Sequence, residues 1–168
     1  MKGSEYEVVS IRQAMQMSSG IKWNEDYNDP ESDVNKSLSM STLEILKFLS
    51  KQPRVATPGE KFNYNTAETH LLGAVVRAAI GNNLSNYLSS KIWEPFGMES
   101  DANWLLMEPY GAENGGCCIS ATLRDYGRIG LFVLKESKIE NEKSVLPKNW
   151  ITDISAPSNG SDSYASLW

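Results

Sequence analysis

Cysteine, histidine and long apolar runs are all scarce in this sequence, which has 2 cysteines and 1 histidine among 168 residues. Cys117 and Cys118 are adjacent, so they cannot cross-link distant segments, and we expect no disulfide framework. His70 is the lone histidine. The sequence therefore does not supply the clustered histidine and cysteine ligands that many metal sites need. No run of about 18 apolar residues occurs, so no membrane-spanning segment is expected.

Positive charge is also in short supply, since 16 lysines and arginines stand against 21 acidic residues and give a net charge of −5. This balance argues against nucleic acid or an anionic membrane surface as the main partner. A glycine-rich phosphate-binding loop is missing too. The first six residues precede no apolar segment and do not have the pattern of a signal peptide, and the compartment is left open. With 40% hydrophobic and 22% charged residues, the composition is that of an ordinary globular protein.

Hydrophobic periodicity predicts a mainly helical chain. We expect helices that begin at Ser10, at Ser41 or Thr42, at Thr66, at Asn83 or Ser85, at residue 120 and near Pro147. Strand signals are confined to Trp104–Met107 and Tyr164–Trp168. Residues 22–40 are expected to form a long polar loop. In the helix over 120–136, the apolar residues are expected to be mostly core: Leu123, Tyr126, Ile129, Leu131, Val133 and Leu134.

The chain is organised around a turn at Pro58-Gly59, where proline fixes φ and glycine takes conformations that other residues avoid. An aromatic, polar stretch leads from this turn to Tyr64, and a helix begins at about Thr66 and ends at Gly81. Tyr64 therefore lies on irregular backbone just ahead of a helix N-terminus, from where its hydroxyl can project into a cleft. A tyrosine there is an acid/base group if a neighbouring cation makes it more acidic, but the residues alone favour a buried structural role.

One Ser-x-x-Lys match is present, Ser19-Gly20-Ile21-Lys22. This motif delivers a serine nucleophile and a lysine on one helical turn. Because Gly20 lies where the preceding helix ends, Ser19 and Lys22 are not expected to share a turn.

The other candidates favour structural roles. His70 lies off the apolar stripe of its helix and is expected to be partly exposed. Cys117 and Cys118 are expected to be small, buried packing residues rather than a thiol of lowered pKa. The acidic side chains in the loop over residues 22–40 are expected to be solvated, because the EF-hand spacing and its glycine are missing; they are Asp26, Asp29, Glu31 and Asp33.

Several ordered segments resemble the serine β-lactamase-related hydrolases, a family of class C β-lactamases, penicillin-binding-protein-like peptidases and esterases. The similarity is strongest to its 6-aminohexanoate-dimer hydrolase branch, because Trp23–Asp33 resembles a loop of that branch. Ala14–Ile21 resembles the family's Ser-Gly turn, and Pro58–Gly73 resembles its run of Pro-Gly, an aromatic residue, Tyr-Ser-Asn and Leu-Leu-Gly. Ile92–Met98 is similar to Ile-x-x-Pro-Leu-Gly-Met, and Ser120–Asp125 is similar to a Ser-Thr-x-x-Asp helix start.

The resemblance implies a fold and a chemistry. It implies that residues 1–168 are a single partial domain, the helical subdomain of the α+β serine β-lactamase/transpeptidase-like fold, with only fragments of its antiparallel sheet. It implies acyl transfer through an acyl-enzyme and no cofactor. It places the nucleophilic Ser-x-x-Lys motif before Met1 and the Lys-Thr-Gly or His-x-Gly motif after Trp168. The chain alone is therefore expected to be inactive.

Two site residues carry over from the family pattern. Tyr64 matches the catalytic tyrosine that helps pass protons between nucleophile, lysine and leaving group. Thr66 stands where the family has an asparagine that touches the substrate amide, and its shorter side chain favours a small ester or linear amide over a β-lactam. The alternative is a non-catalytic binding or assembly module, which would self-associate through the exposed face on which the sheet would pack.

Overall fold

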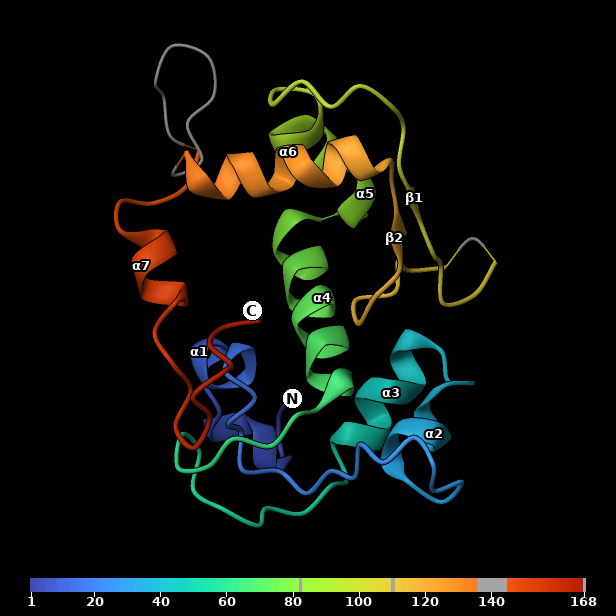
Figure 1. The fold of residues 1–168 in the computed structure, drawn as a ribbon. Helices are drawn as coiled ribbons and strands as arrows, with labels where there is room; N and C mark the ends of the chain where they lie inside the picture. Colours follow the sequence, from blue (N-terminus) through green and yellow to red (C-terminus); the bar gives the residue numbers. More distant parts are fainter. Residues whose placement is uncertain (82, 110, 136–144, 168) are drawn as a thin grey trace.

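One helix, α4 (Thr66–Ile80), runs through the middle of the protein, whose computed structural model describes residues 1–81, 83–109, 111–135 and 145–167 (Figure 1). The helices α1 (Ile11–Met15), α2 (Asp33–Ser37) and α3 (Thr42–Leu49) pack against α4 near its N-terminal end. Helix α5 (Leu84–Leu88) packs against α4 at its other end. The arrangement of the chain is therefore set largely by what covers each side of α4.

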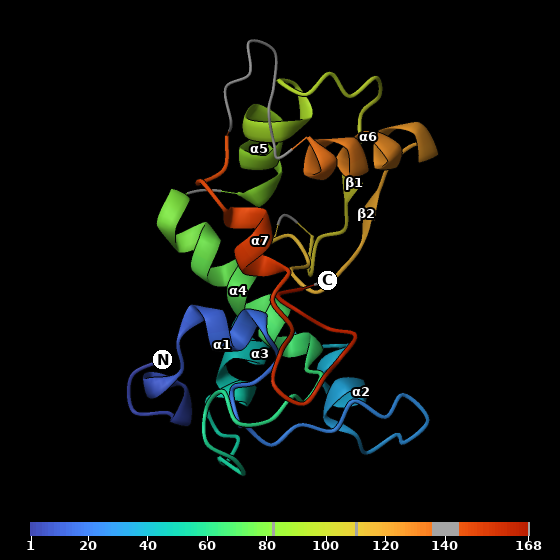
Figure 2. The same ribbon diagram turned by 60° about the vertical axis from the view of Figure 1, so that its left-hand side comes forward.

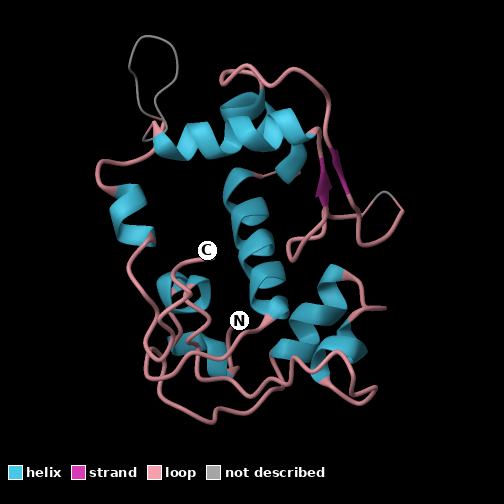
Figure 3. Cartoon of the chain, in the orientation of Figure 1, coloured by secondary structure: helices cyan, strands magenta, loops and turns pink. Residues whose placement is uncertain are grey.

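The remaining elements are short except for α6 (Leu123–Leu134), which lies beyond the C-terminal end of α4 (Figure 1 and Figure 2). They are the 3-10 turn η1 (Glu5–Val8), the π turn η2 (Ser89–Trp93), the strands β1 (Asn103–Trp104) and β2 (Ile119–Ser120), and the helices α6 (Leu123–Leu134) and α7 (Trp150–Ile154). The two strands pair antiparallel, with Asn103 opposite Ser120 and Trp104 opposite Ile119. The prediction of a mainly helical chain is confirmed in the described part (Figure 3).

Side-chain caps explain why most predicted helix starts are accurate. Ser10 and Ser41 each form a capping box with the residue three positions on, at α1 and α3. Asn65, Asn83 and Thr122 accept a hydrogen bond from the backbone N–H three residues later, at α4, α5 and α6. Such caps satisfy N–H groups that have no partner within the helix.

Two predictions about secondary structure are wrong. The loop over residues 22–40 contains the helix α2, which Ser32 caps. The expected strand at Tyr164–Trp168 is irregular over residues 164–167, and Trp168 lies outside the described residues. The backbone of this segment does not bond to a neighbouring strand. Its Tyr164 carbonyl accepts a hydrogen bond from the Ser158 N–H, and its Ser166 N–H donates to the Ile154 carbonyl. A strand needs a neighbouring strand with which to exchange these bonds.

Helix α6 also presents a different face to the core than its periodicity predicted. The buried residues are Asp125 and Phe132. Asp125 accepts from the backbone N–H groups of Glu99 and Ser100 at 2.9 and 3.2 Å, and the Phe132 ring contacts Phe96 with centroids 5.2 Å apart. Ile129 and Val133 are half-buried, whereas four expected core residues are exposed: Leu123, Tyr126, Leu131 and Leu134.

The main apolar cluster lies around the N-terminal half of α4. Its buried members come from η1, the segment after α1, and the helices α2, α3 and α4: Tyr6, Ile21, Trp23, Val34, Ile45, Leu49 and Ala67. The rings of Trp23 and Phe48 meet edge to face with centroids 6.1 Å apart. No helix in the described ranges is long and apolar enough to cross a bilayer.

The segment Ser18–Lys22 is pressed against Pro53–Gly59 by backbone hydrogen bonds. The Gly20 carbonyl accepts from Val55 and Ala56 at 2.8 and 3.1 Å, and the Ser18 carbonyl accepts from Gly59 at 2.7 Å. Gly20 has a φ of 74°, and a Cβ there would lie 2.0 Å from the Ala56 carbonyl oxygen. Because that oxygen belongs to the backbone, it has little freedom to move away.

We expect Gly20→Ala to lower the free energy of unfolding by about 2–3 kcal/mol, since left-handed strain and a backbone clash add together. The measurement is the urea midpoint by circular dichroism. Gly81→Ala is the matched control, because Gly81 has a φ of 73° but no atom lies within 4 Å of an added Cβ. Its cost should be only about 1 kcal/mol, and equal costs would show that the contact with Ala56 is unimportant.

Candidate active site

Tyr64 lies on the irregular backbone between the Pro58-Gly59 turn and α4. Gly59 has a φ of 86°, and its carbonyl accepts from the Asn159 side chain at 2.7 Å. The Phe62 N–H donates to the Asn159 carbonyl at 2.9 Å, and the Asn63 N–H donates to Met17 at 2.8 Å. The backbone on both sides of the aromatic stretch is therefore tied to neighbouring segments.

The Tyr64 side chain itself is open to solvent, with an exposed fraction of 46%. Its ring meets the ring of Tyr164 edge to face, with centroids 6.0 Å apart, and Phe62 contacts the same ring at 5.0 Å. Burial, with a contribution from Tyr64, raises the pKa of the Tyr164 hydroxyl to about 12. The residues alone favoured a buried structural tyrosine at position 64, and the expected burial is wrong.

Thr66, the first residue of α4, is bound to a carboxylate from the polar loop. Its N–H donates to Glu25 Oε2 at 3.1 Å, and its hydroxyl donates to Glu25 Oε1. The Trp23 indole and the Tyr27 hydroxyl donate to the same carboxylate, and Tyr27 also lies 3.5 Å from Thr66 Oγ1. Because the Thr66 proton is committed to Glu25, the hydroxyl oxygen is left to accept a bond from a ligand.

The asparagine next to Tyr64 is turned inward. Asn65 is 1% exposed, and its side-chain carbonyl accepts from the Glu68 N–H at 3.2 Å as the cap of α4. Its Nδ2 atom has no hydrogen-bond partner within the described ranges. Thr66 is therefore the side chain that the helix start presents beside Tyr64 and Tyr27, whereas Asn65 serves the helix.

Glu68 is a buried acid beneath this turn that no sequence motif indicated. It is 0% exposed, and its Oε1 atom accepts from the Tyr6 hydroxyl at 2.8 Å. Its Oε2 atom has no partner among the described residues. Burial raises the pKa of Glu68 to about 7, and hydrogen bonding with the Ser19 and Tyr6 side chains partly opposes that shift. The amphipathic pattern gave no signal for it, because a glutamate in a first helical turn usually faces solvent.

Ser19 belongs to the wall of this buried cluster. It is 4% exposed, and its hydroxyl accepts from the Ile21 N–H at 3.2 Å. Lys22 is exposed and follows outside any helix. The expectation that Ser19 and Lys22 do not share a helical turn is confirmed, and a buried serine that is hydrogen-bonded in place is a poor nucleophile.

His70 is buried rather than partly exposed, so that expectation is wrong. Its exposed fraction is 8%, and burial lowers its pKa. The loop that follows Asn114 covers it, since a Cβ on Gly116 would lie 2.8 Å from His70 Nε2. A Cβ on Gly115 would lie 3.0 Å from the Thr69 carbonyl oxygen. The pair of glycines was the sequence signal for this close approach.

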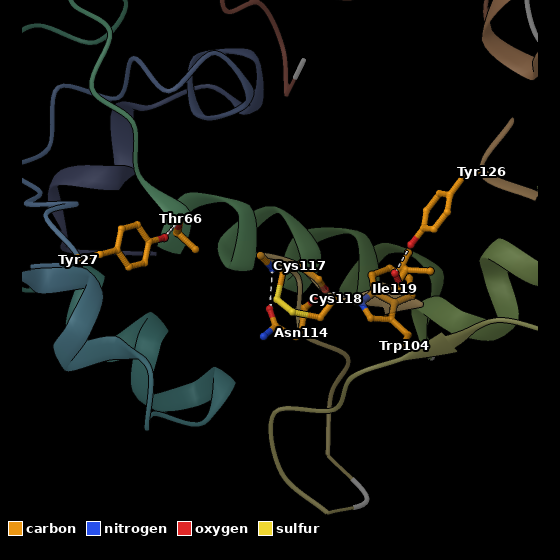
Figure 4. The surroundings of a disulfide bond; sticks show 9 residues. Tyr27, Thr66, Trp104, Asn114, Cys117, Cys118, Ile119 and Tyr126 are labelled. Atoms are coloured by element: carbon orange, nitrogen blue, oxygen red, sulfur yellow. Dashed lines mark hydrogen bonds between the residues drawn. A yellow bond between two sulfur atoms is a disulfide. The ribbon is translucent and has the colours of Figure 1, made fainter. Parts of the chain in front are cut away.

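The two cysteines are exposed and bonded to each other, so the prediction of buried packing residues is wrong. They follow Gly116 on the loop that covers His70. A bond between neighbours links no distant segments, as expected. Figure 4 shows this pair in front of α4, with Thr66 and Tyr27 at the N-terminal end of the helix.

The acidic side chains of the polar loop hold its turns together. Backbone N–H groups two residues on, or across the loop, donate to Asp26, Asp29 and Asp33 at 2.8–2.9 Å. Glu31 instead forms an ion pair with Lys36 at 3.1 Å. The loop is therefore ordered by its own side chains and carries Glu25 and Tyr27 to the start of α4.

Comparison with known proteins defines the class. Residues 1–153 match the family model described as Beta-lactamase, and the chain belongs to this family. It is similar to the 6-aminohexanoate-dimer hydrolase of Paenarthrobacter ureafaciens, with 28% identity over 166 residues. That match covers 93% of this chain but 41% of the relative. The family predicted from the ordered motifs is confirmed.

Solved structures show the same fold. A structure assigned as a 6-aminohexanoate-dimer hydrolase from Bacillus anthracis gives a TM-score of 0.80 at 24% identity, over 99% of this chain and 48% of that one. The octameric penicillin-binding protein homologue from Pyrococcus abyssi gives 0.62 at 21% identity, over 87% and 38%. This chain thus spans less than half the length of these relatives.

The raised pKa of Glu68 predicts a specific pH dependence of stability. A carboxyl held protonated in the folded state contributes stability that is fully present below its unfolded pKa, about 4.5, and is lost as pH rises through about 7. We expect Glu68→Gln to remove this loss, which amounts to roughly 3 kcal/mol between pH 4 and pH 8. The measurement is the free energy of urea unfolding across that range.

Glu44→Gln is the control for that experiment. Hydrogen bonds from Ser41 lower the pKa of Glu44, which is exposed. The stability that ionised Glu44 contributes is present above its unfolded pKa and is lost as pH falls. Glu44→Gln should therefore change the unfolding free energy on the acid side of the pH range. If Glu68→Gln leaves the profile between pH 5 and pH 8 unchanged, Glu68 does not titrate as the structure indicates.

Proposed function

We propose that residues 1–168 are the helical lobe of a serine hydrolase that acts on small linear amides or esters through an acyl-enzyme. The family membership and the similarity to a 6-aminohexanoate-dimer hydrolase support this class of reaction. In this proposal the chain is one partial domain, and the antiparallel sheet of the α+β fold comes from the rest of a longer protein. The observation that carries the proposal is Tyr64, a residue 46% exposed on a fixed turn ahead of α4.

Tyr64 has the chemistry for proton transfer in this reaction. A serine attacks the substrate carbonyl, the leaving group departs, and water hydrolyses the acyl-enzyme. Each step moves a proton between the nucleophile, a base and the leaving group, and a tyrosine hydroxyl can relay it if it lies within hydrogen-bond reach. We infer that the nucleophile is not Ser19, whose hydroxyl is buried against Glu68.

Thr66 supports a small ester or linear amide as the substrate. Its hydroxyl donates to Glu25 and leaves an oxygen that can accept a bond, for example from the N–H of a linear amide. A side-chain amide would offer both a donor and an acceptor with a longer reach. The asparagine that could have served, Asn65, is buried as the cap of α4.

The role of Tyr64 is testable in a chimera in which residues 1–168 replace the aligned part of the Paenarthrobacter ureafaciens hydrolase. We expect Tyr64→Phe to lower kcat for 6-aminohexanoate dimer and p-nitrophenyl esters about 100- to 10,000-fold, with little change in KM. Tyr87→Phe is the control, because Tyr87 is similarly exposed at 44% on α5. Unchanged turnover in Tyr64→Phe would contradict the assignment.

Intact mass of the chain itself after treatment with a fluorophosphonate checks the nucleophile separately. We expect no adduct at Ser19, with Ser19→Ala as the reference. An adduct that disappears in Ser19→Ala would place the nucleophile at this buried serine and contradict the proposed reaction scheme.

A second candidate function is a non-catalytic module that assembles with a second copy of itself. The exposed stripe on α6 favours it, because Leu123, Leu131 and Leu134 are 87, 48 and 80% exposed and lie on one helical face with Tyr126. Added Cβ atoms on Gly127 and Gly130 would meet no atom within 4 Å. An apolar helix face that is open in this way is typical of an interaction surface.

Sedimentation velocity tests this alternative. If the stripe mediates self-association, the sedimentation coefficient should rise with concentration, and Leu134→Lys should weaken association at least about tenfold by placing a charge in the contact. Leu38→Lys is the matched control, since Leu38 is 69% exposed on another surface. A monomer at every concentration would count against the assembly function and leave the helical-lobe proposal in place.

A further inference from the structure

The Cys117–Cys118 pair occupies an exposed loop that is otherwise firmly held. The Asn114 side-chain oxygen accepts from the N–H groups of Gly116 and Cys117 at 2.9 and 3.2 Å. The Trp104 indole donates to the Asn114 and Cys117 carbonyls at 2.8 and 3.1 Å. The Cys118 carbonyl accepts from the Leu105 N–H at 3.0 Å. Both sulfur atoms therefore belong to exposed residues on an ordered backbone (Figure 4).

The same loop is in direct contact with the start of α4. A Cβ on Gly116 would lie 2.8 Å from His70 Nε2 and 3.1 Å from Thr66 Cγ2. On the other side, a Cβ on Gly73 would lie 3.2 Å from Gly115 Cα. A change in the loop backbone next to Cys117 must therefore move these contacts or be resisted by them.

The bond between the two cysteines restricts the backbone of both residues. Cys118 has a φ of 86°, in the left-handed region that a residue with a Cβ enters at a cost in free energy. Adjacent cysteines joined by their sulfur atoms close a small ring that limits the conformations open to both. With separate thiols, Cys118 can return to an extended backbone that continues into β2.

We propose that Cys117 and Cys118 are a redox-active pair that exchanges with low-molecular-weight thiols, and that its state sets the fit of loop 114–118 against the first turns of α4. This inference does not depend on the hydrolase function. Exposed disulfides exchange readily, whereas those that stabilise a core are inaccessible. The ligand class is a soluble thiol such as glutathione.

The exchange balances in two steps. A thiolate attacks one cysteine sulfur, the bond between the cysteines breaks, a mixed disulfide forms, and the other cysteine leaves as a thiolate that takes up a proton. A second thiolate then attacks the mixed disulfide and releases the oxidised small molecule. Two thiols are oxidised to one disulfide, and the protein pair is reduced by two electrons to two thiols.

The experiment equilibrates the purified chain with reduced and oxidised glutathione over a series of ratios, traps free thiols with N-ethylmaleimide and reads intact mass. Both cysteines should become labelled together. The reduced fraction should pass from one tenth to nine tenths over roughly a hundredfold change in the squared concentration of reduced glutathione divided by the concentration of oxidised glutathione. Tryptophan fluorescence should change in parallel, because the Trp104 indole N–H donates a hydrogen bond to the Cys117 carbonyl. The variant Trp104→Phe should lose that change.

Hydrogen–deuterium exchange tests the coupling to α4. Reduction should increase exchange in loop 114–118 and in residues 66–72, and leave α3 unchanged as the internal control. The double variant Cys117→Ser/Cys118→Ser should show the pattern of the reduced protein under oxidising conditions. A change confined to the loop would overturn the coupling.

Three results of the glutathione series would overturn the redox pair itself. One is a bond that no ratio opens although dithiothreitol opens it in guanidinium chloride. Another is two free thiols even in oxidised glutathione alone. The third is a stable mixed disulfide with glutathione as the main oxidised product. The single variants Cys117→Ser and Cys118→Ser show what that last product looks like, because each has one thiol and no partner.

Discussion

Burial of Glu68 beneath the first turn of α4 is the constraint on which the surrounding structure depends. A carboxyl that is 0% exposed must be hydrogen-bonded or neutral, because an unpaired buried charge is costly. Tyr6 from η1 donates to it, and Ser19 from the turn after α1 lies against it. Two segments that are distant from α4 in sequence are thus held against its first turn, and that turn is fixed in place directly after Tyr64.

A second carboxylate holds the outer side of the same turn. Glu25 accepts from the Thr66 N–H, one of the donors that a helix leaves unpaired at its N-terminus, where the helix dipole also favours a negative charge. Glu25 is half-buried and accepts hydrogen bonds from Trp23 and Tyr27, whereas Glu68 is fully buried. The two acids therefore stabilise different contacts. Glu25 joins the polar loop to α4, and Glu68 joins the N-terminal segments to α4.

The sequence predicted local structure well and the direction of helix faces poorly. Ser10, Ser41 and Asn83 are capping residues whose effect is local, so the starts of α1, α3 and α5 could be read from the chain. The buried face of α6 depends instead on Asp125 and Phe132 meeting residues 96–100, which are remote in sequence. Periodicity located the helix correctly but assigned the exposed stripe to the core, because it cannot tell whether a partner surface is present.

The candidate site divides in the same way. Tyr64 and Thr66 were predicted from a motif. A motif indicates the role of a position within a family but not which residues surround it in the fold. Glu68, Glu25 and the covered His70 were missed, because each depends on a contact between segments that are 40 or more residues apart. Only the glycines at 115 and 116 hinted at such a contact, and they did not identify the helix that the loop would cover.

The position of Tyr64 follows from these contacts taken together. An acid/base group must be open to its substrate yet held within a fraction of an ångström, so its backbone has to be fixed by parts other than its own side chain. Gly20 and Gly59 fix the turn before Tyr64, Glu25 and Glu68 fix the helix after it, and the side chain keeps an exposed fraction of 46%. Tyr6, by contrast, is 6% exposed and donates its hydroxyl to Glu68, so its role is structural. Of these two tyrosines, only Tyr64 is open to a substrate, which is what its proposed acid/base role requires.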